Sequence, residues 1–526
     1  MVNTRTLAAL CCAIGSGTTS AQPTPETTAW LQANAHSLAA TEPESGLEDL
    51  ECLRELIGDA RVVGLGGSTH GTHEQSQLKH RIVEFLASEM GFSVLAVGAS
   101  TPDAHRVDRY VSDGKGDAVR FIKGMRSWAF DTEELVEMVQ WMRRFNEKDV
   151  GPSIRFAGLG AQYPESISTE LSNAVHPHDP ELANILAAES DALLAGMRSS
   201  APPVLAMTTT TIEAGPLAGK TVRFTADVST SAIDEYAKIW ISAHQADESP
   251  ALAMTQHAPS SGDSDWRTHE LEITIPDGAT SLSFGFLMGR TGQAFFDRVT
   301  LTADDEPIEL PFDPSFETGA SSTLIAGIQK PYFAGTSKDR AAHGERSFVI
   351  SRLNAIPFHK LRESTTAFES RAHGLIDGSN LPAMAAAWAK HMATVLRQSL
   401  HQIAPGPNGM PPLQGHERAM ADNIHWILDQ DPNTKVIVWG HNGDVRALDG
   451  SVGEYLKKEL GDSYVPVGFS TSAGRYRAQV MGQGHRSNSL KGPHPRTVEA
   501  HFDAAEISLA ILDTRTAKPV TRGRAG

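Results

Sequence analysis

Short apolar runs alternate with amphipathic stretches in the first and last thirds of the chain. The stretch from Leu78 to Met90 has apolar residues at every fourth position, which predicts a helix with one buried face. Further helices are predicted over residues 135–142, 357–402 and 420–428. The apolar runs are residues 60–65, 93–100, 154–160 and 435–440, each typical of a strand covered on both faces. Strands alternating with helices predict an α/β fold with a mainly parallel sheet flanked by helices.

The middle of the chain follows another pattern. From about Thr208 to Arg352, short alternating runs are separated by turn residues, and helical periodicity is absent. This predicts an all-β jelly-roll sandwich of seven or eight strands inserted into the α/β domain. We therefore expect a first α/β part over residues 22–205, the inserted β-sandwich over 206–353, and a second α/β part over 354–526.

The N-terminal 21 residues have the features of a signal peptide. Arg5 precedes a short apolar region over 7–15, and small residues lead to a cleavage site near Ala21. The apolar region is too short to span a membrane, and no other segment is a candidate span. We expect export to the periplasm or outside the cell. Cleavage would leave Cys52 as the single cysteine, so no internal disulfide is expected.

The chain of 526 residues has a formal net charge of −17, which argues against a nucleic-acid partner because phosphates require a basic surface. It also lacks a phosphate-binding P-loop, a dinucleotide fingerprint and a Gly-x-Ser-x-Gly nucleophile elbow.

Four residues fall where predicted strands end: His70, Gly98, Gly160 and His441. The carboxyl ends of parallel strands form one edge of a sheet, where ligands usually bind. We therefore expect these positions to lie close together although they are far apart in sequence. The imidazole of His70 has a suitable ordinary pKa to accept a proton near neutral pH.

Six segments in order resemble the erythromycin esterase family. They are LGGSTHGTHEQSQLKHRIVEFLASEMGFSVLAVGAS, WAFDTEELVEMVQWMRRFN, IRFAGLGAQYP, HERAMADNIHWIL, VIVWGHNGDV and VGEYLKKELGDSYVPVGFS. The resemblance implies metal-independent attack of water on an ester or lactone, a macrolide being one candidate, without a cofactor. It assigns His70 as general base, with neighbouring carboxylates, His441 and an arginine completing the site. Our hypothesis for His441 is a second base or an oxyanion donor.

The chain departs from the family pattern at the site. Glycines stand where the family has carboxylates, His416-Glu417 replaces an Arg-Asp pair, and Asp444 replaces a histidine. Three missing acids would remove charge from the pocket and enlarge it. The positions expected to line the substrate pocket are Gly67, Gly98, Gly160, His73, His416 and Asn442.

Other carboxylates are candidates to replace the missing ones. Glu74 lies four residues after His70, on the first helical turn, and is the best candidate to orient its ring. Glu417 and Asp444 are further catalytic candidates. For each of these residues a structural role is the alternative to a catalytic one. Glu74 would be a helix N-terminal charge that the helix dipole favours. His441 and Asn442 would cap the segment that follows them.

Two other functions remain open. A catalytically silent family member would use the pocket to bind a ligand. A metal cage is the other, because His70 and His73 are three residues apart, as are His441 and Asp444; we nevertheless expect no metal.

Aromatic residues suggest one further partner. The insertion resembles carbohydrate-binding-module jelly rolls, and Tyr236, Trp240 or Trp266 would stack on a glycan if exposed. Trp128, Trp141 and Trp439 are expected in the core.

Overall fold

The computed structural model separates the chain into two units. It describes residues 8–12, 22–148, 152–200, 205–245, 253–256, 260–319, 322–325, 328–329, 331–353, 358–402, 412–448, 450–480, 484–490 and 492–515. The first unit comprises residues 1–184, 372–406 and 410–526, and the second comprises 185–371 and 407–409. The second unit thus interrupts the first along the chain.

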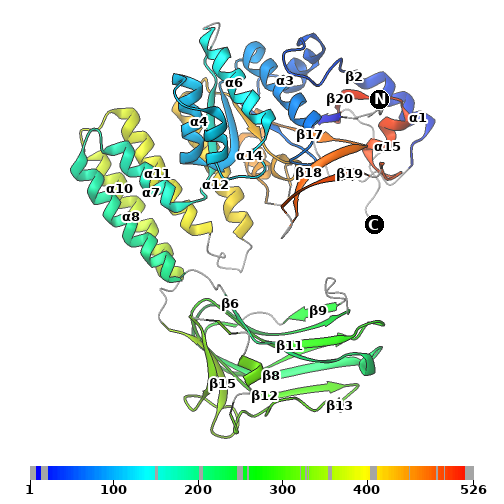
Figure 1. The fold of residues 1–526 in the computed structure, drawn as a ribbon, viewed down its shortest axis with the longest axis vertical. Coiled ribbons are helices and arrows are strands. Elements are labelled where there is room, and N and C mark those ends of the chain that lie inside the picture. Colours follow the sequence, from blue (N-terminus) through cyan, green and yellow to red (C-terminus); the bar gives the residue numbers. More distant parts are fainter. Residues whose placement is uncertain are drawn as a thin grey trace. The chain divides into compact units, whose positions relative to one another are not determined.

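The first unit is built on an eight-stranded sheet in the order β2-β20-β1-β17-β3-β16-β4-β5 (Figure 1). The strands are β1 (Ala8–Cys12), β2 (Ala35–Ser37), β3 (Val62–Leu65), β4 (Val94–Ser100), β5 (Arg155–Gly160), β16 (Val436–Trp439), β17 (Tyr464–Ser470) and β20 (Leu509–Asp513). From β17 to β5 every neighbouring pair is parallel. The predicted parallel sheet is therefore confirmed, and its four predicted strands lie side by side.

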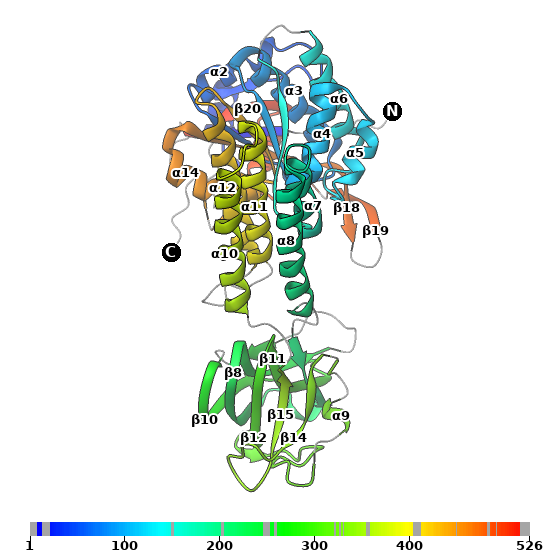
Figure 2. The same cartoon turned by 90° about the vertical axis from the view of Figure 1, so that its left-hand side faces the viewer.

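Helices cover both faces of this sheet (Figure 2). They include α1 (Pro25–Asn34), α2 (Cys52–Ile57), α3 (His73–Met90), α4 (Thr101–Asp113), α5 (Ala118–Gly124), α6 (Glu133–Glu147), α7 (Pro164–Val175), α11 (Ala383–Gln402), α12 (Pro412–Gln430), α13 (Asn442–Val445), α14 (Val452–Leu460) and α15 (Val498–Ala504). In β4, Leu95 and Val97 pack in one cluster with residues of α3 and α6. Val94 and Ala96 pack in another with residues of α12 and α14. This two-sided burial explains the continuous apolar runs.

The second unit contains an antiparallel β region whose described strands form one hydrogen-bonded network of ten. The strands are β6 (Leu205–Met207), β7 (Thr210–Glu213), β8 (Thr221–His244), β9 (Ala253–Gln256), β10 (Ser260–Thr274), β11 (Ser281–Gly289), β12 (Gly292–Ala303), β13 (Glu306–Pro307), β14 (Phe333–Ser337) and β15 (Ser347–Arg352). Helices α8 (Pro180–Ser200) and α10 (Phe358–Asp377) flank this region in sequence, and the short α9 (Ser322–Ile325) lies within it.

Two details of the β region differ from expectation. Runs that the sequence separates form the single 24-residue strand β8, in which Ala232 has φ 51°. Trp240 is buried and its indole N–H donates to the Thr208 carbonyl at 3.2 Å, so the expectation that Trp240 stacks on a glycan is wrong. Tyr236 and Trp266 are partly exposed. The carbohydrate-binding-module resemblance stays a prediction.

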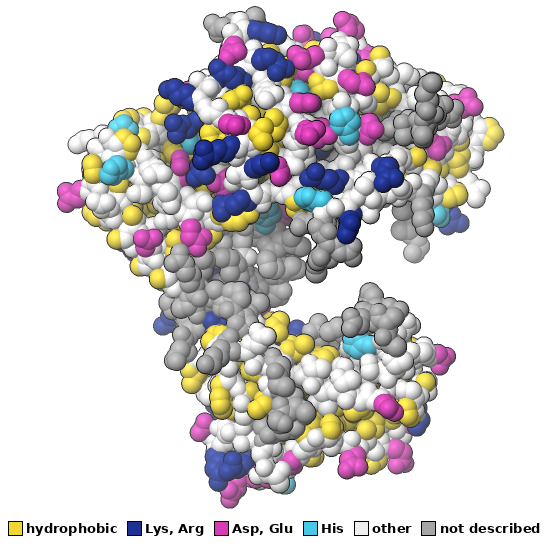
Figure 3. Space-filling view, viewed as in Figure 1, with side chains coloured by type: hydrophobic (Ala, Val, Ile, Leu, Met, Phe, Trp, Pro, Cys, Tyr) yellow, Lys and Arg dark blue, Asp and Glu magenta, His cyan; other side chains and the backbone are white. Residues whose placement is uncertain are grey.

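The N-terminal apolar region forms β1, which pairs with β17 on one side and with β20 on the other. The predicted cleavage site near Ala21 lies outside the described residues. Among the helices of the described residues, none is long and apolar enough to cross a membrane. On the face of the first unit seen in Figure 3, basic and acidic side chains are intermixed.

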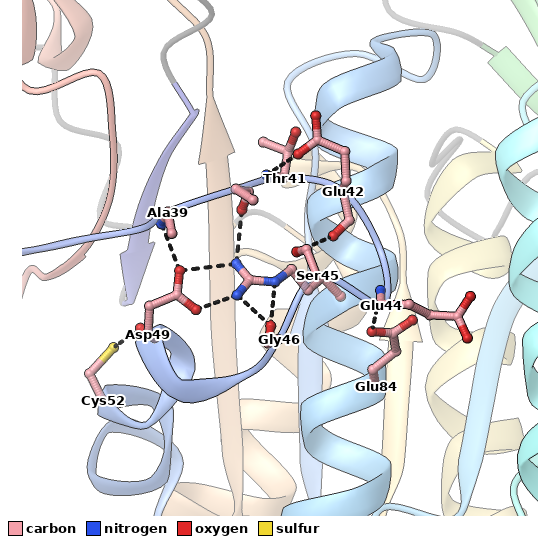
Figure 4. A network of polar contacts seen from close by, with 11 residues as sticks. Ala39, Thr41, Glu42, Glu44, Ser45, Gly46, Asp49, Cys52 and Glu84 are labelled. Carbon is pink, nitrogen blue, oxygen red and sulfur yellow. Dashed lines mark hydrogen bonds and ion pairs between the residues drawn. The ribbon is translucent and has the colours of Figure 1, made fainter.

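A buried arginine joins α3 to the segment that precedes α2. Arg81 is 1% exposed, and its guanidinium pairs with Asp49 and donates to the carbonyls of Ala40 and Gly46 (Figure 4). The same carboxylate accepts from the Ala39 N–H at 2.7 Å. Because α3 also carries residues of the candidate site, this network fixes the helix on which the site is built.

Candidate active site

His70 lies in the turn between β3 and α3, at the carboxyl edge of the sheet. Its ring is half-buried and meets the Trp128 ring edge to face, with the centroids 5.4 Å apart. The His441 ring lies 5.2 Å away. The expected convergence of His70 and His441 is thus confirmed. No hydrogen bond between described residues involves the His70 ring nitrogens, which leaves both available to water or substrate.

The charge state of His70 is set by its surroundings. Burial lowers its pKa from the ordinary value of 6.5, and the nearby His441 and Lys79 lower it further, while Asp444 opposes them. The imidazole is therefore neutral at pH 7 and able to accept a proton.

His441 uses both ring nitrogens within the fold. Nδ1 accepts from the Gly443 N–H at 3.1 Å, and Nε2 donates to the Ser68 carbonyl at 3.2 Å. The His441 N–H in turn donates to the Asp444 carboxylate at 2.8 Å, which completes a capping box at α13. This is the capping alternative raised by the sequence; the catalytic role of His441 stays a prediction.

Asn442 joins the same turn to β17. Its amide donates to the Phe469 carbonyl at 2.7 Å and accepts from the Phe469 N–H at 3.0 Å. A Cβ on Gly66 would lie 2.3 Å from the Asn442 side-chain oxygen, so only glycine fits there. These hydrogen bonds hold the turn after β16 against β17, and they occupy the side-chain amide of Asn442, a residue that was predicted to contact substrate.

Lys79 lies one to two turns into α3 and is 4% exposed. Its ammonium donates to the Gly440 carbonyl at 2.9 Å and lies 4.9 Å from the Trp439 ring centroid and 5.5 Å from that of Phe469. Burial lowers the pKa of Lys79 to about 7, against the attraction of Asp444. Lys79 and His70 line one cavity of about 10 Å³, roughly the space of one water molecule.

The three glycines of the site do not leave open space. A Cβ on Gly67 would meet the Lys79 ammonium at 3.0 Å, and one on Gly98 would meet the Met420 methyl at 3.3 Å. At Gly160 it would meet the Gln162 side-chain oxygen at 2.0 Å. Neighbouring side chains fill each position, so the expectation that the missing acids enlarge the pocket is wrong.

Asp444 influences several groups of the site through its charge. It raises the pKa of His70, Lys79 and His416, in each case against the larger effect of burial. Burial first and Asp444 second raise the pKa of Glu417 to about 7, while the Val452 N–H donates to that carboxylate at 3.1 Å and lowers it. Asp444 thus acts on His70 through its charge. Glu417 lies in α12, and its carboxylate accepts from Val452, the first residue of α14.

Glu417→Gln is expected to stabilise the protein above neutral pH. The folded state raises this pKa from 4.5 to about 7, so the carboxylate destabilises the fold progressively as the pH rises through that window. Glutamine retains the acceptor for Val452 without the charge. We expect a gain of about 2 kcal/mol at pH 8, after discounting for partial exposure, and none at pH 4.

Denaturant unfolding at both pH values measures this difference. Glu459→Gln is the matched control, because Arg418 and His425 lower the pKa of Glu459 and its loss destabilises the protein at high pH. Equal stabilisation of Glu417→Gln at pH 4 and pH 8 would show that charge is not the cause.

His73 and Glu74 begin α3. The His73 ring bonds to the Glu134 carboxylate at 2.6 Å, which raises the pKa of His73. The charge of Glu74 also raises the pKa of His73. The roles of Glu74 as the orienter of His70, and of His73 in substrate binding, stay predictions.

A two-stranded hairpin contacts the outer side of the His70 turn. It consists of β18 (Gly474–Val480) and β19 (Gly484–Leu490). The Arg477 N–H donates to the Gly71 carbonyl at 2.9 Å, and the His485 ring lies 6.3 Å from that of Trp128. Trp128 is 37% exposed, so its assignment to the core is wrong, whereas Trp141 and Trp439 are buried as expected.

Sequence reasoning missed Trp128 and Lys79 as site residues. The available signal for Lys79 was its place directly after Leu78 and four residues before Val83, next to the apolar stripe of the predicted helix. Among the described residues, no group of three or more His, Cys, Asp or Glu side chains is arranged to hold a metal ion.

The fold and this site define an α/β protein with a histidine at the carboxyl edge of a parallel sheet, beside a buried lysine. The chain belongs to the erythromycin esterase family, whose model matches residues 87–267 and 350–525, more than half of the chain. The match begins within α3, so the turn that carries His70 lies before it.

Known proteins support this assignment at low identity. The protein named "Putative hydrolase YbfO" of Bacillus subtilis (strain 168) is 28% identical over 158 residues, 30% of this chain and 34% of that protein. Erythromycin esterase type II of Escherichia coli is 28% identical over 152 residues, 28% of this chain and 35% of that protein. The chain therefore aligns with about a third of each relative.

A solved structure shares the fold. The crystal structure of a Bacillus cereus protein superimposes on this chain with a TM-score of 0.57 and 19% sequence identity. The match covers 94% of this chain and 87% of the Bacillus cereus chain. The resemblance seen in the sequence is confirmed for the family and for the fold.

Proposed function

We propose that this protein hydrolyses an ester or lactone by attack of water, with His70 as general base. The observation that carries the proposal is the His70 ring: neutral at pH 7, without a hydrogen bond to another described residue, and lining a cavity of about 10 Å³. The two relatives named as a hydrolase and an erythromycin esterase support the reaction class. A macrolide is one candidate substrate, and export of the protein is part of the proposal.

The chemistry follows from the geometry. A water bound at a free ring nitrogen gives up a proton to His70 as its oxygen attacks the acyl carbon. His70 then returns that proton to the departing alkoxide. Between these two transfers the ring is an imidazolium, which the negative charge of Asp444 stabilises by raising the pKa of His70.

A pH profile on a broad ester panel, including a macrolide lactone, tests the proposal. Because burial lowers the pKa of His70 below 6.5, kcat/KM should rise along an acid limb centred below pH 6.5 and stay level through neutrality. A parallel sample dialysed against a chelator tests the metal alternative. An acid limb centred above pH 6.5 would contradict His70 as the base.

The second candidate function is ligand binding without catalysis. It is favoured by Gly67, Gly98 and Gly160, whose side-chain positions are occupied by neighbours that supply no carboxylate. Binding of a panel ester without turnover at any pH would support this function instead.

A further inference from the structure

The strongest unexplained feature of the site is a buried lysine. Lys79 is 4% exposed, yet among the described residues no carboxylate lies within ion-pairing distance of its ammonium. Burying a charge without a partner is costly, and such a group is normally paired or bound to a ligand. The position is therefore incomplete in the protein alone.

The contacts of Lys79 leave room for a ligand. An ammonium has three donors, and one of them is bonded to the Gly440 carbonyl. Aromatic rings of Trp439 and Phe469 lie on other sides. Gly67 contributes no side chain, although its Cβ position is 3.0 Å from the ammonium. At this point the protein offers a cation and donors but no anion.

The cavity connects this cation to the proposed base. Lys79 and His70 both line it, together with hydrogen-bonding side chains of Thr69, Gln75 and Ser76. Its volume of about 10 Å³ admits roughly one oxygen atom. A carboxylate has two oxygens, one of which fits this space, whereas inorganic phosphate or sulfate has four oxygens to place.

We propose that Lys79 anchors a carboxylate of the substrate, so that the ester or lactone hydrolysed at His70 carries a free carboxylate group near the scissile bond. The ester part of this inference rests on the proposed function, but the carboxylate site does not. Binding neutralises Lys79 and holds the acyl carbon beside the base. Because the pKa of Lys79 is lowered to about 7, we also expect the site to take up a proton when the carboxylate binds.

Matched substrates measure the effect on turnover. The 4-nitrophenyl ester of succinate, with its second carboxylate free, is compared with the same ester capped by a methyl group. The ratio of kcat/KM for the free form to that for the capped form should fall about 100-fold in Lys79→Met, because one partner of a buried charge pair is lost. Lys435→Met is the control: its ammonium likewise donates to a carbonyl, that of Met90 at 3.1 Å.

Direct binding separates this inference from the proposed function. Calorimetry with succinate should show binding to the wild type that Lys79→Met abolishes, even if no ester is turned over. Ester hydrolysis without succinate binding, or equal binding of inorganic phosphate, would overturn the carboxylate site while the proposed hydrolase stands.

A second pair of variants tests the same site in case Lys79→Met fails to fold. Gly67→Glu places an internal carboxylate next to the flexible end of Lys79, and Gly67→Gln has the same shape without the charge. Succinate affinity should fall at least tenfold more in Gly67→Glu than in Gly67→Gln. Equal losses in the two variants would show that bulk, rather than charge, blocks the cavity.

Discussion

His70→Ala should lower kcat/KM for the best ester by about 10² to 10⁴-fold, the usual contribution of a general base. The variant removes a half-buried ring that contacts Trp128 and His441 and makes no hydrogen bond to another described residue. Its unfolding free energy should therefore change little. Steady-state kinetics on the same ester, with a thermal melt of the same sample, measure both quantities.

His178→Ala is the matched control for this variant. His178 is exposed between α7 and α8 and is not among the residues named for the site. We expect less than a tenfold change in kcat/KM for His178→Ala. A similar loss in the two variants, or an active His70→Ala, would remove His70 from the mechanism.

Arg81→Met should destabilise the protein by about 3–5 kcal/mol, the usual cost of breaking a buried ion pair. Asp49 is left without its guanidinium, and the carbonyls of Ala40 and Gly46 lose their donor. Denaturant unfolding measures the change.

The matched control is Arg54→Met, which removes an exposed arginine paired with Glu51 and Glu89. Exposed pairs contribute about 1 kcal/mol or less. If Arg81→Met costs no more than Arg54→Met, the network around Arg81 does not anchor α3.

The sheet could be predicted because its strands are covered on both faces. Continuous apolar runs such as Val94–Ser100 and Val436–Trp439 are short and rich in valine, which favours buried strands, and helices separate them. The length of β8 could not be predicted from the local sequence pattern, because one strand continues through the apparent break near Ala232.

The candidate site could be predicted only in part. The sequence predicted that His70 and His441 lie close together, because both follow strands of one parallel sheet and the carboxyl ends of such strands share an edge. The pattern could not reveal that Nδ1 of His441 caps α13 and that Nε2 bonds to the Ser68 carbonyl, since hydrogen-bond partners depend on the turns of neighbouring strands. Lys79 was missed for a similar reason: its acceptor, Gly440, is 361 residues away in sequence.

The hairpin β18–β19 has a consequence for how such a site diversifies. It forms its own two-stranded sheet and touches the His70 turn through Arg477 and Trp128 through His485. His70 follows a strand of the central sheet, whereas the hairpin comes from a segment about 400 residues further along the chain. None of the described core clusters of the first unit includes a residue of this hairpin, so substitutions in it would change the surroundings of the His70 turn without repacking the interior.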